Sequence, residues 1–119
     1  MDITELDKQS SIRTINEEIK TLEVLRDQMD GSLTAALDLM INSTGRIIIT
    51  GMGKSGHIGK KIVASLASTG TPSFFVHPAE ASHGDLGMIT QNDVVIAISN
   101  SGESRELGDI IAYCKRFTI

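Results

Sequence analysis

A glycine-rich segment at residues 51–57 has the composition of an anion-binding turn. It reads Gly-Met-Gly-Lys-Ser-Gly-His and follows the G-x-G-x-x-G pattern. Glycines in such a turn let backbone N–H groups approach an anion at the positive end of a helix dipole. A dinucleotide site would need an acidic residue about 20 positions later, where Val76 and His77 stand. A nucleotide P-loop would place the lysine after the second glycine, whereas Lys54 precedes Gly56. The segment therefore favours phosphate binding over dehydrogenase or ATPase chemistry.

A second polar segment, residues 99–106, reads Ser-Asn-Ser-Gly-Glu-Ser-Arg-Glu. One interpretation is helix capping, with Ser101 as N-cap and Ser104 nearby. A cap needs only one hydroxyl, however, so the three serines favour an oxyanion site, in which each charge-assisted hydrogen bond contributes on the order of 1.5–3 kcal/mol. Together the two segments supply the candidate substrate-binding residues, which are Gly53, Ser55, Gly56, Ser99, Asn100, Ser101, Gly102 and Ser104.

Residues 77–87 form a third polar stretch, which holds two histidines and two carboxylates. It is either a plain surface loop or a wall of the same site. We expect no metal requirement, although imidazoles near carboxylates can hold Zn²⁺, so a zinc role for His57, His77 and His83 stays open.

The apolar pattern between these segments predicts strands that alternate with helices. Ile47–Thr50 is a continuous β-branched run typical of a central parallel strand. Further strands are expected at 73–77 and 93–99, and helices at about 58–66 and 107–114. The fold class is therefore α/β, a three-layer α-β-α arrangement with a parallel, flavodoxin-like sheet. If the strand order is 2-1-3, both polar loops border the switch-point crevice where open α/β sheets bind ligands.

Two amphipathic helices, at about 12–29 and 33–41, are expected to open the chain as a helix hairpin. We therefore assign residues 1–44 to N-terminal helices and 45–119 to the sheet-containing domain. The apolar stripe of the first helix either packs on its own domain or makes a subunit contact.

Composition excludes several classes of protein. Aromatic residues are only 3% of the chain, which leaves few platforms for stacking bases, so we expect no nucleic-acid partner. No apolar run approaches the ~20 residues of a bilayer span, and the N-terminus lacks the pattern of a secretory signal. The single Cys114 is expected to be inert packing. These features predict a cytoplasmic protein without a membrane partner.

Four blocks in order resemble the sugar isomerase (SIS) domain of D-arabinose 5-phosphate isomerases. They are residues 51–57, 71–78, 82–87 and 99–104. The resemblance implies a five-stranded parallel sheet, a homo-oligomer, a phosphosugar ligand and no cofactor. It also implies interconversion of D-ribulose 5-phosphate and D-arabinose 5-phosphate, on the route to the Kdo sugar of lipopolysaccharide.

The same resemblance suggests catalytic roles for three residues. Lys54, His83 and Glu106 match the family's proposed catalytic positions. We interpret Glu106 as the base, Lys54 as the group that stabilises the oxyanion, and His83 as a proton carrier or an aid to ring opening. Lys54 as a phosphate ligand, and Glu106 as a solvated first-turn carboxylate, are the alternatives.

Members of the family continue beyond the segments matched here. They add two strands, a functional histidine and commonly a pair of CBS modules, so we expect residues 45–119 to be the N-terminal part of an incomplete SIS domain that is inactive alone. A non-catalytic sugar-phosphate-binding module and a remnant of an interrupted gene are the other readings. A sensor needs the serines but not Lys54, His83 and Glu106, so the joint presence of these three favours the enzyme.

Overall fold

The computed structural model describes residues 2–119, which divide into two compact units, one reaching to Leu37 and the other formed by Asp38–Ile119. The division falls inside the second helix, and the domain boundary between residues 44 and 45 stays a prediction. None of the helices in residues 2–119 combines the length and apolarity needed to cross a bilayer.

Two helices open the chain, as predicted. Helix α1 is Ile3–Asp27 and helix α2 is Gly31–Ile41. The break between them is stabilised by Asp30, whose carboxylate accepts a 2.8 Å hydrogen bond from the Ser32 amide. Neither helix contains a buried residue, so the packing of the two as a hairpin also stays a prediction.

The second unit is built on a three-stranded parallel sheet. Strands β1 (Ile47–Gly51), β2 (Ser73–Phe75) and β3 (Val94–Ile98) lie in the order β2-β1-β3, as the sequence predicts. Every residue of the central strand β1 is buried, whereas β3 is only half-buried. The continuous β-branched run of β1 thus marks the strand that is covered on both faces.

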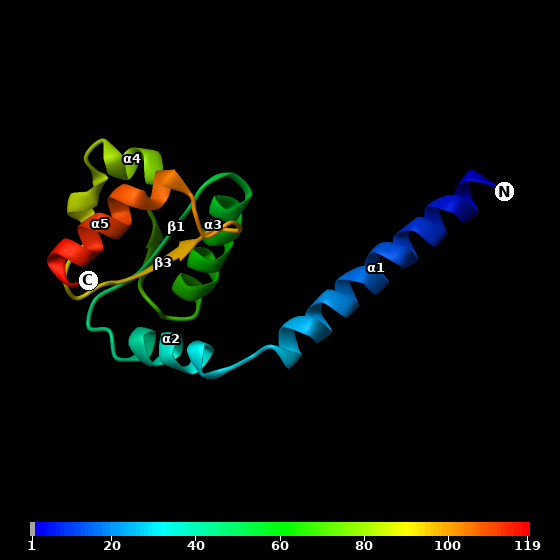
Figure 1. Ribbon diagram of the computed structural model, residues 1–119, viewed down its shortest axis with the longest axis horizontal. Helices are drawn as coiled ribbons and strands as arrows, with labels where there is room; N and C mark the ends of the chain where they lie inside the picture. The colour runs from blue at the N-terminus through cyan, green and yellow to red at the C-terminus, as the bar shows by residue number, and fades with distance from the viewer. Residues whose placement is uncertain (1) are drawn as a thin grey trace. The chain divides into compact units, whose positions relative to one another are not determined.

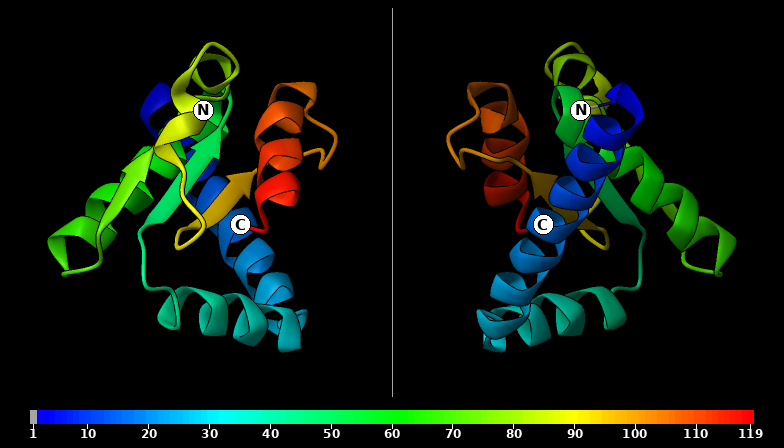
Figure 2. Two further views of the ribbon diagram at one scale, coloured as in Figure 1. Left: turned by 90° about the vertical axis from the view of Figure 1, so that its left-hand side faces the viewer. Right: turned by 90° about the vertical axis from the view of Figure 1, so that its right-hand side faces the viewer.

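Helices cover both faces of this sheet, which gives the α-β-α layers (Figure 1). Helix α3 (Gly53–Ser68) packs on the face of Ile49, where a Cβ added to Gly59 would lie 3.0 Å from the Ile49 side chain. Helices α4 (Pro78–Ser82) and α5 (Gly108–Phe117) cover the opposite face, on which Ile48 and Ile110 share the buried core. Figure 2 shows α3 and α5 on opposite sides of the strands. Alternate residues of β1 therefore face different helices.

Short 3₁₀ turns complete the second unit. The turn η1 spans Asp85–Met88, and η2, spanning Arg105–Leu107, leads directly into α5. Leu107 and Ile89 are buried beside these turns. The three strands and the helices α3 and α5 all agree with the sequence-based expectation, while α4 and both 3₁₀ turns lie in segments expected only to be polar.

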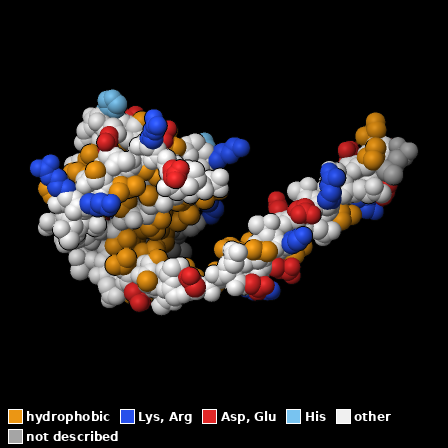
Figure 3. All heavy atoms as spheres, in the orientation of Figure 1, with side chains coloured by type: hydrophobic (Ala, Val, Ile, Leu, Met, Phe, Trp, Pro, Cys, Tyr) orange, Lys and Arg blue, Asp and Glu red, His pale blue; other side chains and the backbone are white. Residues whose placement is uncertain are grey.

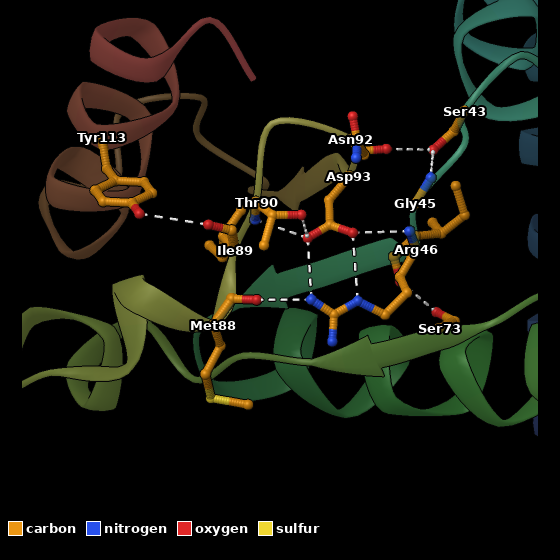
Figure 4. Close-up of polar contacts among 11 residues, drawn as sticks. Ser43, Gly45, Arg46, Ser73, Met88, Ile89, Thr90, Asn92, Asp93 and Tyr113 are labelled. Atoms are coloured by element: carbon orange, nitrogen blue, oxygen red, sulfur yellow. Dashed lines mark hydrogen bonds and ion pairs between the residues drawn. The ribbon is translucent and has the colours of Figure 1, made fainter.

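A buried carboxylate ties the amino ends of β1 and β3 together. The Asp93 side chain is 1% exposed and accepts hydrogen bonds from the Arg46 amide at 2.8 Å and from the Thr90 amide at 2.8 Å. The guanidinium of Arg46 adds an ion pair at 3.2 Å and reaches the carbonyl of Met88 at 2.8 Å (Figure 4). Burial alone would raise the pKa of Asp93, but the hydrogen bonds from Arg46 and Thr90 lower it to about 2.

We expect Asp93→Asn to lower the free energy of unfolding by roughly 2–4 kcal/mol at neutral pH, because the amide cannot satisfy the donors gathered around the carboxylate. Urea unfolding followed by circular dichroism measures this. Asp38→Asn is the matched control, because Asp38 is exposed and its carboxylate makes no hydrogen bond within residues 2–119. A loss no larger than that of the control would contradict the account.

The pH dependence follows from the lowered pKa of Asp93. A carboxyl whose folded pKa is about 2, below its usual 3.8, contributes stability that is complete above about pH 4 and is lost as the pH falls through 2. The difference in stability between the wild type and Asp93→Asn should therefore shrink by about 2 kcal/mol between pH 4 and pH 2. Urea midpoints at several pH values test this, and a constant difference would contradict it.

Candidate functional site

The two polar loops leave the sheet at adjacent positions. Gly51 ends β1 and is paired in register with Ile98, which ends β3. A Cβ added to Gly51 would lie only 3.1 Å from the carbonyl oxygen of Ile98. The loops that begin at Met52 and Ser99 therefore start side by side at the carboxyl edge of the sheet, as the 2-1-3 order requires.

The first loop is a tight turn that connects β1 to α3. Gly53 has a φ of +54°, a conformation that glycine adopts without strain. Gly56 packs against the end of β1 so closely that an added Cβ would lie 2.5 Å from the carbonyl oxygen of Gly51. The residue before the helix, Met52, provides no side-chain cap, so the first N–H groups of α3 lack the partner that a capping side chain would supply. This is the local arrangement that suits an anion.

The serine loop is held by its own hydroxyl groups. The Ser99 oxygen accepts a 3.0 Å hydrogen bond from the Gly102 amide and lies 2.8 Å from the Ser104 hydroxyl. The Ser101 oxygen accepts from the Glu103 amide at 3.1 Å. Gly102 has a φ of +72°, which allows the loop to turn back on itself.

The capping interpretation of this loop is therefore wrong. Helix α5 begins after Leu107, and the Ser104 side chain does not cap the turn η2 that follows it. The paired hydroxyls of Ser99 and Ser104 use only one of their two hydrogens on each other, and within residues 2–119 the Ser101 hydroxyl acts only as an acceptor. Two hydroxyl hydrogens of the loop thus remain available to a further acceptor. The loop is thus held in shape by its own hydrogen bonds while part of its donor capacity is unused among residues 2–119.

The three candidate catalytic residues come from three elements. Lys54 lies in the first turn of α3, exposed, with no hydrogen-bond or ion-pair partner within residues 2–119. Glu106 is exposed in η2, and His83 is the C-cap of α4. Because α4 contacts η2, the structure brings together the elements that carry His83 and Glu106, whereas Lys54 belongs to the helix on the other face of the sheet.

The ring of His83 is oriented by its own helix. Its Nδ1 lies 2.7 Å from the carbonyl oxygen of Ala79. A carbonyl only accepts, so we assign the proton to Nδ1, which leaves Nε2 as an acceptor in the neutral ring. That tautomer makes Nε2 the atom that can exchange a proton with a ligand.

A small cleft of about 110 Å³ adjoins the first loop, lined by Gly51, Gly53, Gly56, His57, Lys60, Phe75 and His77. His77 has a structural role here, because its Nδ1 accepts a 3.2 Å hydrogen bond from the Ala79 amide and so caps α4. Within residues 2–119 no three histidine, cysteine or acidic side chains gather closely enough to hold a metal ion. The structure thus does not assemble the three histidines into a zinc site.

Two features near the site lie outside the sequence-based candidates. Helix α4 was expected only as a polar stretch, although Pro78 at its first position is a recognisable start signal. Thr50, one residue before the first loop, is fully buried and its hydroxyl has no hydrogen-bond partner among residues 2–119. No sequence signal separates this threonine from the β-branched run before it.

Comparison with known proteins relates this chain to SIS domain proteins. The SIS domain pattern matches residues 40–119. The chain is 53% identical over 110 residues to the arabinose 5-phosphate isomerase KdsD of Pseudomonas aeruginosa and 52% identical over 113 residues to that of Francisella tularensis, with 92% of this chain covered in each. These matches cover 34% and 35% of the relatives, so the chain spans about a third of the length of the curated relatives it matches.

Solved structures agree with the sequence comparison. A protein of E. coli CFT073 in complex with arabinose 5-phosphate matches with a TM-score of 0.88 and 40% identity, over 98% of this chain and 62% of that one. A putative sugar-phosphate isomerase of Listeria monocytogenes matches with a TM-score of 0.89 and 30% identity, over 98% and 61% of the two chains.

The close approach of Gly56 to the carbonyl oxygen of Gly51 can be tested by substitution. We expect Gly56→Ala to cost roughly 1–3 kcal/mol of stability, because the new methyl group would displace α3 from the end of β1. Gly108→Ala is the matched control, since Gly108 is helical with φ −57° and nothing lies within 4 Å of its added Cβ; it should gain about 0.4–1 kcal/mol. Urea midpoints measure both, and equal changes in the two variants would refute the packing argument.

Proposed function

The chain belongs to the SIS domain family, and from this membership we propose that residues 45–119 form the phosphosugar-binding part of a D-arabinose 5-phosphate isomerase. The observation that carries the proposal is the register pair Gly51–Ile98, because it starts the glycine-rich loop and the serine loop next to each other. The names of the KdsD relatives and the arabinose 5-phosphate complex of the E. coli protein support this choice of sugar phosphate.

Phosphate binding is assigned to the two loops. The phosphate would accept hydrogen bonds from the first N–H groups of α3 and from the outward hydroxyl hydrogens of the serine loop. Ser101 supplies one such hydroxyl, and the hydrogen-bonded Ser99 and Ser104 supply another between them. No other residue among 2–119 uses these donors, which supports a ligand role.

Isomerisation is assigned to Lys54, His83 and Glu106. In the aldose, a base removes the proton from C2 while the C1 carbonyl oxygen takes up negative charge. The resulting enediol is reprotonated at C1, and loss of the proton from the C2 hydroxyl gives the ketose. Glu106 is the proposed base, and Lys54 stabilises the developing oxyanion. His83 moves the hydroxyl proton through Nε2, the nitrogen that Ala79 leaves available.

No redox cofactor enters this reaction, because the aldose and the ketose are isomers. Protons move between positions of the same sugar, and there is no net oxidation or reduction. We also propose a cytoplasmic location for the protein and little or no turnover by the 119-residue chain alone. Binding measurements therefore test the site more directly than a rate does.

We expect the chain to bind D-arabinose 5-phosphate but not D-arabinose, since the phosphate supplies the charge that the two loops recognise. Ser101→Ala should weaken binding roughly 10- to 100-fold by removing one charge-assisted hydrogen bond. Isothermal titration calorimetry measures the affinity. Ser68→Ala, at the far end of α3, is the control and should bind as the wild type does; equal affinity for the unphosphorylated sugar would contradict the assignment.

The catalytic assignment is tested with a mimic of the enediolate. A four-carbon hydroxamate phosphate of D-erythro configuration should bind roughly 100-fold more tightly than the sugar phosphate, or better, if Lys54 and Glu106 meet the reacting atoms. Glu106→Gln should abolish most of that preference while leaving sugar-phosphate affinity within a few-fold, and Glu103→Gln is the loop control. Lys54→Met should also reduce the preference. Equal binding of both compounds by the wild type would indicate a non-catalytic binding module.

A further inference from the structure

The cleft of about 110 Å³ beside the first loop lies between α3 and the end of β2. Its lining residues come from the end of β1, from α3, and from β2 and the residues that follow it. The strand order places β2 and β3 on opposite sides of β1, and no residue of β3 or of the serine loop lines the cleft. The cleft is therefore separate from the space between the two polar loops, to which the phosphosugar is assigned.

Basic side chains line this cleft, and none of its lining residues is acidic. His57 and Lys60 lie about one turn apart on α3, and His77 follows β2. Within residues 2–119 Lys60 makes no ion pair, and its Nζ lies 5.2 Å from the centroid of the Phe75 ring. Figure 3 shows lysine and arginine side chains projecting from the side of the second unit on which α3 begins. The positive charge of Lys60 is thus available to an anion.

The ring of His77 supplies a hydrogen-bond donor in its neutral form. Its Nδ1 accepts the hydrogen bond from the Ala79 amide, so we assign the proton of the neutral ring to Nε2. No residue among 2–119 accepts a hydrogen bond from this nitrogen. His57, exposed on α3, adds a second imidazole, which donates from one nitrogen when neutral and from both when protonated. Three side chains of the cleft can therefore donate to a ligand.

The Phe75 ring gives the cleft a fixed apolar wall. A Cβ added to Gly56 would lie 3.3 Å from this ring, and one added to Gly59 would lie 3.2 Å from it. The ring also meets His77 edge to face, with the ring centroids 6.5 Å apart. These contacts hold the ring against α3. A wall of this kind excludes water from one side of a bound anion, which strengthens the interactions of the anion with the basic side chains.

We propose that this cleft is a second anion site, which binds a phosphate group as free phosphate or as a phosphate monoester. A phosphate monoester presents three strong acceptor oxygens and close to two negative charges at neutral pH, which matches donors from His57, Lys60 and His77. A carboxylate has two oxygens in one plane and a single charge, so it matches these donors less well. The site goes beyond the proposed isomerase function and does not depend on it.

Two-dimensional ¹H–¹⁵N NMR of the full 119-residue chain at low salt tests the site, with inorganic phosphate as the probe. We expect saturable shifts of the His57 and His77 amide signals. Lys60→Met should weaken the binding that causes these shifts roughly 10-fold or more, because it removes a charge-assisted donor, whereas Lys60→Arg should retain most of the affinity. An absence of saturable shifts at these two amides overturns the proposal.

Lys61→Met is the matched control for Lys60→Met. Lys61 is also exposed on α3, but it does not line the cleft and its Nζ lies 2.8 Å from the Ser65 hydroxyl. This variant should bind phosphate in the cleft as the wild type does. Circular dichroism checks that each variant folds. Equal affinities of Lys60→Met and Lys61→Met for phosphate in the cleft would overturn the assignment of Lys60.

The serine loop separates this site from the proposed phosphosugar site in the same titration. Phosphate should also shift the amide signals of residues 99–104 if it enters the phosphosugar site. Ser101→Ala should then weaken the loop shifts and leave the cleft shifts unchanged, whereas Lys60→Met should do the reverse. Loss of both sets of shifts in either variant would indicate a single site and would overturn the second one. Absence of the loop shifts alone contradicts the proposed function and leaves the cleft site intact.

Two further probes test the chemical class of the ligand. Acetate should bind in the cleft at least several-fold more weakly than phosphate, and equal affinity overturns the choice of phosphate. Methyl phosphate distinguishes the two sources of the group. Shifts like those from inorganic phosphate assign the cleft to phosphate monoesters as well, and their absence assigns it to free phosphate alone.

Discussion

The buried carboxylate of Asp93 is the constraint on which the arrangement of the second unit depends. By accepting the amide of Arg46 and pairing with its guanidinium, it fixes the start of β3 against the start of β1. A slip of one residue would separate these groups and leave an unpaired charge in the interior, which is costly. The same register sets Gly51 opposite Ile98 five residues later, at the edge where both polar loops begin. The contact between Asp93 and Arg46 at the amino edge of the sheet thus sets which residues lie side by side at the carboxyl edge.

Polar groups at the two edges of the sheet differ in how much of their hydrogen-bonding capacity the protein itself uses. At the amino edge, both oxygens of Asp93 are occupied and the carboxyl is held ionised, because its pKa is lowered to about 2. At the carboxyl edge, the serine hydroxyls satisfy one another only in part, and Lys54 has no partner within residues 2–119. Polar groups whose hydrogen bonds are all made within the protein contribute to its stability. Polar groups with unused hydrogen-bonding capacity contribute to recognition when a ligand supplies the missing partners.

Sequence patterns predicted the elements whose signal is local and repeated. The β-branched run of Ile47–Thr50 identified the central strand, and the turn chemistry identified the glycine-rich and serine loops. Helix α4 was missed because five residues are too short to show a helical period. The partner of Asp93 lies 47 residues away in Arg46, and no local pattern encodes such a pairing. The self-bonded serine loop depends on the positive φ of Gly102, which composition alone does not reveal.

The helix α1 illustrates the same distinction between local and non-local information. Its period of three and four residues specifies a helix with one apolar face, but periodicity does not say what covers that face. The intrachain interpretation and the subunit interpretation predict the same hydrophobic spacing. The local pattern of α1 therefore specifies the helix and its apolar face, whereas the group that covers this face is non-local information that the pattern does not carry.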